Sequence, residues 1–337
     1  MIRVKIVSFT ARGAQTAARA AAALTDCCVE RYARGVDRSL HQTRLSRMVQ
    51  QAMVDCDLIV FVGATGIAVR MCAPFLQGKQ YDPAVVVIDE QGKFVISLLS
   101  GHLGGANALA QELADGLHAQ AVITTATDGR GAFAVDSWAK AHGCTVYEVD
   151  QIKHISGAIL AEQTVGFQSD FPISGDFPKG LAEAGNSGIV VSVRTEQKPF
   201  AHTLHLVPKI VTLGIGCRRG TPMEEIERAV YAVLEEEQMP VSAICAVASI
   251  DVKKDELGLC AFCQKQGLPF LTYTAQELLE VSGEFSASAF VQRTVGVDNV
   301  CERAALKASE GGQLLRRKTP CGGITVALAM RNWEVVF

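Results

Sequence analysis

Residues 98–115 read LLSGHLGGANALAQELAD, and this stretch sets the fold class of the chain. An apolar run ends at Ser100, and His102 then stands among three glycines, Gly101, Gly104 and Gly105. Glycine suits a backbone that turns sharply or lets another group approach closely. The apolar residues that follow recur at helical spacing: Ala106, Leu109, Ala110, Leu113 and Leu117. The stretch therefore predicts a strand, a tight turn and an amphipathic helix.

The same alternation extends along the chain in both directions. In the N-terminal part, strands are predicted at 2–9, 58–63, 84–89, 94–99 and 120–124, with helices at 14–25, 41–55 and from about 104. In the C-terminal part, strands are predicted at 210–216, 243–250, 268–272 and 323–330, with helices at 221–237, 255–266, 275–280, 288–293 and 297–309. Thr221 and Glu224 form a predicted capping box, with Pro222 at the first helical position.

Strands that are apolar throughout and alternate with helices indicate mostly parallel sheets covered on both faces. Between the two patterned parts, prolines interrupt short segments, and the periodicity is weak. We therefore predict an α/β protein with two α/β sandwich units, residues 1–137 and 210–337, joined by a small linking domain at 138–209.

The composition narrows the class of protein. The chain has 337 residues, 49% hydrophobic and 20% charged, which is typical of a globular protein. Its net charge of −3 favours neither nucleic acid nor an acidic membrane surface as a partner. We expect no signal peptide and no membrane-spanning segment. The 11 cysteines are scattered and odd in number, which favours a reducing, cytoplasmic location. Cys260 and Cys263 form one C-x-x-C, which we interpret as structural, and we predict no metal site.

Polar, glycine-containing loops follow three predicted strands of the N-terminal unit. Their candidate binding residues are Gly63, Thr65 and Gly66 in the first loop, Gly104, Gly105 and Asn107 in the second, and Thr125, Thr127 and Asp128 in the third. Because the carboxyl ends of parallel strands lie along one rim, these loops are predicted to line one ligand cleft. Gly104 and Gly105 would offer the unpaired N–H groups of a helix start to an anion. The alternative for the second loop is a tight structural turn with a hydrogen-bonded histidine.

The C-terminal unit contains LGIGCRRGT at residues 213–221. The stretch lacks the third glycine of a dinucleotide fingerprint and the lysine of a P-loop. What remains is a turn at Gly214 and Gly216, followed by Arg218 and Arg219 beside a helix start. Two arginines in that position suit carboxylates or phosphates. The alternative is a pair of solvated arginines on a surface turn.

Taken together, these motifs resemble one family. GATGIAVR, LLSGHLGGAN, ITTATD, LGIGCRRGT, KKDELGL, FSASAFV and GVDNVCERAAL occur in the order found in the CbiG family, the cobalt-precorrin-5A hydrolases of anaerobic cobalamin synthesis. The resemblance covers nearly the whole chain, although residues 156–208 carry little of it. It implies that water opens the δ-lactone of cobalt-precorrin-5A, an anionic tetrapyrrole, and that acetaldehyde then leaves to give cobalt-precorrin-5B. It also implies that cobalt arrives with the substrate and that no separate cofactor is needed.

This chemistry suggests roles for the predicted site residues. Lactone opening needs a base or acid and donors for the oxyanion, so we assign His102 to proton transfer. Ser100, Asn107 and the N–H groups of Gly104 and Gly105 are candidate oxyanion donors. Asp128 would orient His102 or act as an alternative base. The remaining candidates in the glycine loops, together with Gly214, Gly216, Arg218 and Arg219, would bind the substrate.

Two further expectations concern partners and an alternative function. We expect a homodimer and transient contact with neighbouring methyltransferases of the pathway. The alternative function is a non-catalytic corrinoid-binding or delivery protein of the same pathway. Detection of acetaldehyde during turnover separates the two.

Overall fold

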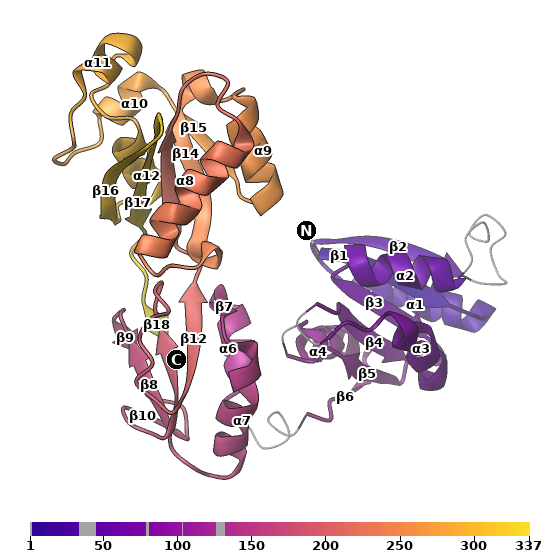
Figure 1. The fold of residues 1–337 in the computed structure, drawn as a ribbon. Coiled ribbons are helices and arrows are strands. Elements are labelled where there is room, and N and C mark those ends of the chain that lie inside the picture. The colour runs from indigo at the N-terminus through magenta and orange to yellow at the C-terminus, as the bar shows by residue number, and fades with distance from the viewer. Residues whose placement is uncertain (1, 34–44, 79–80, 103, 126–131) are drawn as a thin grey trace. The chain divides into compact units, whose positions relative to one another are not determined.

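The computed structural model describes residues 2–33, 45–78, 81–102, 104–125 and 132–337, and the chain divides into two units, Met1–Trp138 and Ala139–Phe337. The first unit is built on one sheet of strand order β2-β1-β3-β4-β5-β6 (Figure 1). Its strands are β1 (Ile2–Ser8), β2 (Cys27–Ala33), β3 (Leu58–Val62), β4 (Ala84–Ile88), β5 (Phe94–Leu99) and β6 (Gln120–Val122). Its helices are α1 (Ala11–Ala23), α2 (Leu45–Asp55), α3 (Thr65–Cys72), the 3-10 turn η2 (Ala73–Phe75) and α4 (Ala106–Leu117), and α6 (Val135–Ala141) follows at the boundary with the second unit.

Alternate residues of the central strands form two cores, one on each face of this sheet. On one face, Val60 and Ile6 pack with the alanine-rich side of α1 and with α4. On the other face, Phe61 and Val7 pack with α2 and α3. Burial of each such side chain contributes roughly 1.5–3 kcal/mol relative to exposure. The predicted α/β class with mostly parallel strands is confirmed.

One strand of this sheet runs against its neighbours, and that reversal changes where the loops lie. β1, β2, β3 and β4 are parallel, whereas β5 is antiparallel to β4 and β6 is parallel to β5. The connection 89–93 is too short for a parallel crossover, which needs a dozen or more residues. Asp89 closes it as a hairpin, because its carboxylate accepts hydrogen bonds from the N–H groups of Gln91, Lys93 and Phe94. Gly92 supplies a positive φ of 71°.

The predicted single rim is therefore wrong. The loop with Gly63 and Gly66 follows β3 and lies at one end of the strands. The loops after β5 and β6, which contain Ser100 and Thr125, lie at the opposite end of the strands. The hydroxyl of Ser100 in fact donates to the carbonyl oxygen of Asp82, just before β4 begins.

The second unit contains two five-stranded sheets. The first has the order β10-β8-β11-β12-β7 and comprises β7 (Cys144–Val146), β8 (Val165–Ser169), β10 (Leu181–Ala182), β11 (Ser187–Val191) and β12 (His202–Pro208), with η3 (Val149–Gln151) and α7 (Ile152–Leu160). The second has the order β15-β14-β13-β17-β16 and comprises β13 (Val211–Gly216), β14 (Ile244–Ile250), β15 (Phe270–Tyr273), β16 (Gln313–Cys321) and β17 (Ile324–Met330). Its helices are α8 (Met223–Glu236), α9 (Leu257–Gln266), α10 (Ala275–Leu279), α11 (Ala289–Val295) and α12 (Cys301–Ala308), with the 3-10 turns η4 (Val241–Ala243) and η5 (Asp251–Lys253).

The C-terminal tail ties the two sheets of this unit together. β18 (Val335–Val336) pairs with β9 (Ile173–Ser174) beside the first sheet, although the sequence predicts no strand after 330. The ring of Phe337 packs edge-on against Phe167 at 5.1 Å between centroids. The domain boundaries at 137/138 and 209/210 stay predictions.

Two further expectations fail locally. Thr221 does not cap α8, because its hydroxyl donates to the carbonyl oxygen of Arg218 and the helix begins after Pro222. Among the residues that the structure describes, Thr274 and Glu277 form a capping box at the start of α10. β2 and β16 were not predicted because each is a partly exposed edge strand without a run of buried apolar residues.

Candidate functional site

The turn between β5 and α4 satisfies the N–H groups of its own helix start. Ser100 and Gly105 have positive φ angles of 56° and 83°. In this conformation the N–H of Gly105 donates to the carbonyl oxygen of His102 at 2.9 Å, and the N–H of Ala106 donates to that of Ser100 at 3.1 Å. The next N–H, that of Asn107, donates to Gly101 at 3.0 Å. The Gly105 N–H is thus already used within the turn, contrary to its predicted role as an oxyanion donor.

Packing within the turn also accounts for Gly104. A Cβ atom at this position would lie 2.4 Å from the Cβ of Ser100 and 2.8 Å from its carbonyl oxygen, so no side chain fits there. The close approach of Ser100 therefore explains the glycine at position 104, and no approach of the substrate is needed to explain it. A substrate-binding role for this residue stays a prediction.

Side chains around this turn form a hydrogen-bonded group. Asn107, with only 8% of its surface exposed, accepts from Ser97 at 2.6 Å and donates to Thr125 at 3.1 Å. His102 is half-buried, and its Nδ1 lies 2.8 Å from the hydroxyl of Ser137. The structure thus brings His102, Ser100, Asn107 and Thr125 to one end of the strands. Thr127 and Asp128 lie outside the described residues.

The first glycine loop lies apart from this group, at the other end of the strands. The N–H of Gly63 donates to the carbonyl oxygen of Ile88 at 2.8 Å, and a Cβ atom there would lie 3.1 Å from the ring of Phe9. Thr65 begins α3, and the carbonyl oxygen of Gly66 accepts from Arg70. These residues and His102 therefore do not form one cleft within the first unit.

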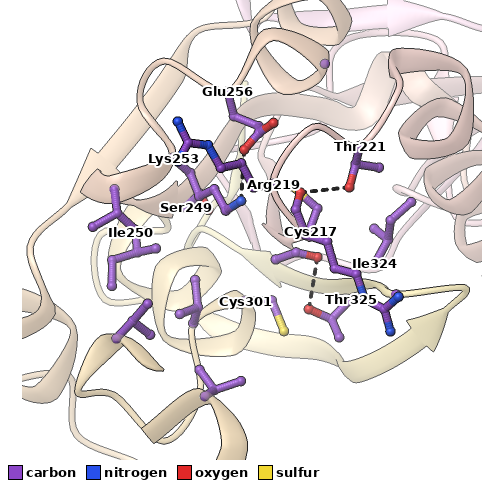
Figure 2. Close-up of a pocket in the computed structure, with 18 of the residues that line it drawn as sticks. Cys217, Arg219, Thr221, Ser249, Ile250, Lys253, Glu256, Cys301, Ile324 and Thr325 are labelled. Carbon is purple, nitrogen blue, oxygen red and sulfur yellow. Dashed lines mark hydrogen bonds and ion pairs between the residues drawn. The ribbon is translucent and has the colours of Figure 1, made fainter. Parts of the chain in front are cut away.

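The second unit contains a large cavity, of about 1400 Å³, at the carboxyl ends of β13 and β14 (Figure 2). Ligands bind at strand ends of this kind in open α/β sheets. The charged side chains that line it are Arg218, Arg219, Lys253, Lys318, Asp255 and Glu256. Apolar side chains line other parts of it, among them Ile250 and Ile324. Val252 and Leu257 also line it, although 66% and 84% of their surfaces are exposed.

The glycines before the arginines serve different purposes. Gly214 lies within β13, where a Cβ atom would meet the carbonyl oxygen of Cys301 at 1.8 Å, so this glycine lets α12 approach the strand. It is not among the residues that line the cavity, and its contact with substrate stays a prediction. Gly216, Arg218 and Arg219 do line it. Both arginine residues are exposed.

Sequence reasoning missed Lys253, Glu256 and Lys318 as lining residues. Glu256 accepts from the ammonium of Lys253 at 2.9 Å and from the N–H of Gly220 at 2.6 Å. The bond from Lys253, aided by that from Gly220, lowers the pKa of the Glu256 carboxyl. KKDELGL contains both Lys253 and Glu256, so that motif was the available signal.

A buried carboxylate, that of Glu302, holds the backbone at Lys318, one of the residues that line the cavity. Glu302 is fully buried and accepts from the N–H groups of Ser286 at 3.0 Å and Lys318 at 2.7 Å. Burial alone would raise the pKa of Glu302, but the hydrogen bonds from Lys318 and Ser286, together with the charge of Arg317, outweigh it and the pKa is lowered. The amide of Asn299 also donates to the carbonyl oxygen of Ser286. FSASAFV and GVDNVCERAAL are thus joined by an internal hydrogen-bond network.

The two cysteines of the cavity are poor nucleophiles. Burial raises the pKa of Cys301 to about 11 and also raises the pKa of Cys217. A thiol must ionise to attack a carbonyl or bind a metal strongly. Near neutral pH, the cavity therefore offers cationic and hydrogen-bonding groups rather than thiolates.

Comparison with known proteins places these features in a family. Models for the cobalamin synthesis G N-terminal region, the cobalamin biosynthesis central region and the cobalamin synthesis G C-terminus match residues 47–128, 133–208 and 211–329. The cobalt-precorrin-5A hydrolase of Salmonella typhimurium is 38% identical over 298 residues, which is 84% of each chain. That of Priestia megaterium is 32% identical and covers 82% of this chain and 79% of its own.

One solved structure, a cobalamin biosynthesis protein G homolog from Sulfolobus solfataricus, is 22% identical, with a TM-score of 0.43 over 97% of this chain and 96% of its own. Among the described residues, no helix combines the length and apolar character needed to cross a membrane. The family models and the two hydrolases together cover most of the chain, and the protein belongs to the cobalamin synthesis G (CbiG) family.

Proposed function

We propose that this protein is a cobalt-precorrin-5A hydrolase. It opens the δ-lactone of its substrate with water and releases acetaldehyde, giving cobalt-precorrin-5B. Membership of the family supports this function, as do the names of relatives that are 38% and 32% identical. The location we propose is the cytoplasm.

The observation that carries the proposal within the structure is the cavity of about 1400 Å³ with Arg218 and Arg219 at its edge. A tetrapyrrole with acetate and propionate arms has a broad apolar face and several carboxylates. Arginine binds carboxylates through parallel N–H···O bonds. The apolar side chains of Ile250, Val252 and Leu257 would contact the macrocycle, while the arginines would bind its arms.

The reaction divides into two steps. Water adds to the lactone carbonyl, the ring C–O bond breaks, and a carboxyl group and a hydroxyl group are formed. The hydroxyl then loses its proton, the carbon–carbon bond to the macrocycle breaks, and acetaldehyde leaves while the electron pair stays on the macrocycle. We assign proton transfer to His102, held through Nδ1 by Ser137, with Ser100 and Asn107 as neighbouring polar groups. The second step makes this a hydrolase that acts on a carbon–carbon bond.

The substrate carries its own cobalt, and the substrate's conjugated macrocycle would accept the electrons of the second step. We therefore propose no resident metal and no nicotinamide for this protein. A homodimer and transient contact with methyltransferases of the pathway remain part of the proposal.

The test is turnover of purified protein with cobalt-precorrin-5A under anaerobic conditions. Acetaldehyde is measured by coupled oxidation of NADH with alcohol dehydrogenase, and the corrinoid product is identified by mass spectrometry. We expect one acetaldehyde per cobalt-precorrin-5B formed. Tight binding of the substrate without acetaldehyde release would refute the hydrolase and support the alternative, a corrinoid-binding or delivery protein.

A further inference from the structure

The loop that carries Arg218 and Arg219 is fixed from several sides. The hydroxyl of Thr221, a residue only 9% exposed, donates to the carbonyl oxygen of Arg218 at 2.8 Å. The first turn of α9 packs closely below it, because a Cβ atom at Gly258 would lie 2.1 Å from the carbonyl oxygen of Thr221. The loop is therefore positioned by α9 and by the residues that precede this helix.

Glu256 provides the remaining attachment. Its Oε1 accepts the N–H of Gly220 at 2.6 Å, directly after Arg219, and its Oε2 accepts the ammonium of Lys253 at 2.9 Å. Its side chain is only 8% exposed, against 15% for that of Lys253. Figure 2 shows Glu256, Arg219 and Lys253 grouped on one side of the cavity.

A carboxylate at this place opposes the binding of an anion by its charge alone. It lies among the cations that would bind substrate carboxylates, and like charges repel. The presence of Glu256 among these cations is explained if its carboxylate strengthens anion binding in another way. The hydrogen bond to Gly220 supplies that second effect, since it fixes the backbone from which both arginines project.

We infer that Glu256 is a positioning residue for polycarboxylate binding: through the N–H of Gly220 it holds the arginine loop, residues 217–221, in the conformation that binds the carboxylate arms of a corrinoid. The inference rests on the proposed function for the identity of the ligand. The side chain of Arg218 lies against the turn between β16 and β17, since its Nε is 3.1 Å from the position of a Cβ at Gly323.

Two variants separate the positioning effect from the charge effect. Glu256→Gln removes the negative charge and the ion pair with Lys253 but keeps an oxygen that accepts from Gly220. Glu256→Ala removes the charge, the ion pair and the acceptor together. The probe is dicyanocobyrinic acid, a corrinoid with free carboxylates, titrated calorimetrically at low salt, with its neutral heptamethyl ester as the uncharged comparison.

We expect Glu256→Gln to bind the acid at least as tightly as the unaltered protein. Glu256→Ala should bind it about tenfold more weakly than Glu256→Gln, since only the alanine variant loses the hydrogen bond that holds the N–H of Gly220. Affinity for the ester should differ little between the two variants. Equal affinity of the two variants for the acid overturns the inference, whether both gain or neither changes.

A matched control is available on the outer side of the same helices. Glu227 pairs with Lys265 at 2.8 Å and joins α8 to α9 away from the cavity. Glu227→Ala and Glu227→Gln should bind the acid alike, and a tenfold difference between them would also overturn the inference. Failure of the unaltered protein to bind the acid overturns it too, whereas acetaldehyde release from cobalt-precorrin-5A tests the hydrolase separately.

Discussion

The glycine-containing turn between β5 and α4 and the one between β13 and α8 both join a strand to a helix, but they are held in different ways. In the first, the N–H groups of Gly105, Ala106 and Asn107 donate to carbonyl oxygens of the turn itself. In the second, the backbone is held from outside by Glu256, and two exposed arginines project beside a cavity. Glycine after a strand therefore indicates a turn in both places, and the side chains that the turn carries decide what it can bind.

The largest effect is expected at the first turn, where His102 is assigned to proton transfer. His102→Asn should lower kcat for acetaldehyde release by roughly 100- to 10,000-fold if it transfers a proton. The control is His118→Asn, since His118 is an exposed histidine at the other end of α4 in a left-handed conformation that asparagine tolerates. Equal rates for the two variants would make the first turn purely structural.

The next effect is expected at the second turn. Arg218→Ala combined with Arg219→Ala should weaken binding of dicyanocobyrinic acid roughly 100-fold at low salt, because two charge-assisted contacts are lost. The dependence of affinity on salt should also become shallower. Arg228→Ala removes an exposed arginine of α8 and should change neither property. An unchanged affinity and salt dependence in the double variant would show that both arginines are solvated surface residues that do not contact the ligand.

Alanine substitutions sharpen the comparison between the turns themselves. Gly104→Ala should lower the free energy of unfolding by about 1–3 kcal/mol, because its Cβ would overlap the backbone and side chain of Ser100. Gly220→Ala should lower it by about 1 kcal/mol, the penalty of a positive φ, since no atom lies within 4 Å of the added Cβ. Urea unfolding of both variants measures the difference. The reverse order of stabilities would contradict the packing described for the first turn.

The last prediction concerns Glu302 and the dependence of stability on pH. The pKa of Glu302 is lowered in the folded state, so its contribution to stability is complete above the ordinary glutamate range and is lost as the pH falls through the lowered pKa. Glu302→Gln places an N–H group against one of two backbone N–H donors and should lower the free energy of unfolding by about 1–3 kcal/mol near neutral pH. That difference should shrink below about pH 4. A difference independent of pH would show that the charge of Glu302 is unimportant.

The sequence predicted the α/β class well because buried strands and amphipathic helices carry strong periodic patterns. It failed at β5, where the short connection 89–93 should have indicated a hairpin, and that single reversal separated Gly63 from Ser100. It also could not distinguish Gly214, which makes room for α12, from Gly216, which lines the cavity. Such differences depend on packing between segments far apart in the chain. Lys318 reaches the cavity from β16, far along the chain from Lys253 and Glu256, so no local pattern brings it together with them.

The most direct test of the cavity as the substrate-binding site is the position of the cobalt in a bound corrinoid. Crystals of the protein soaked with dicyanocobyrinic acid would be measured at the cobalt absorption edge, where anomalous scattering locates the metal without reference to the corrin ring. We predict one strong peak within the cavity, with carboxylate density at hydrogen-bonding distance from Arg218 and Arg219. A fully occupied peak beside the Ser100–Gly105 turn, with no corrinoid density at the arginine loop, would contradict this account.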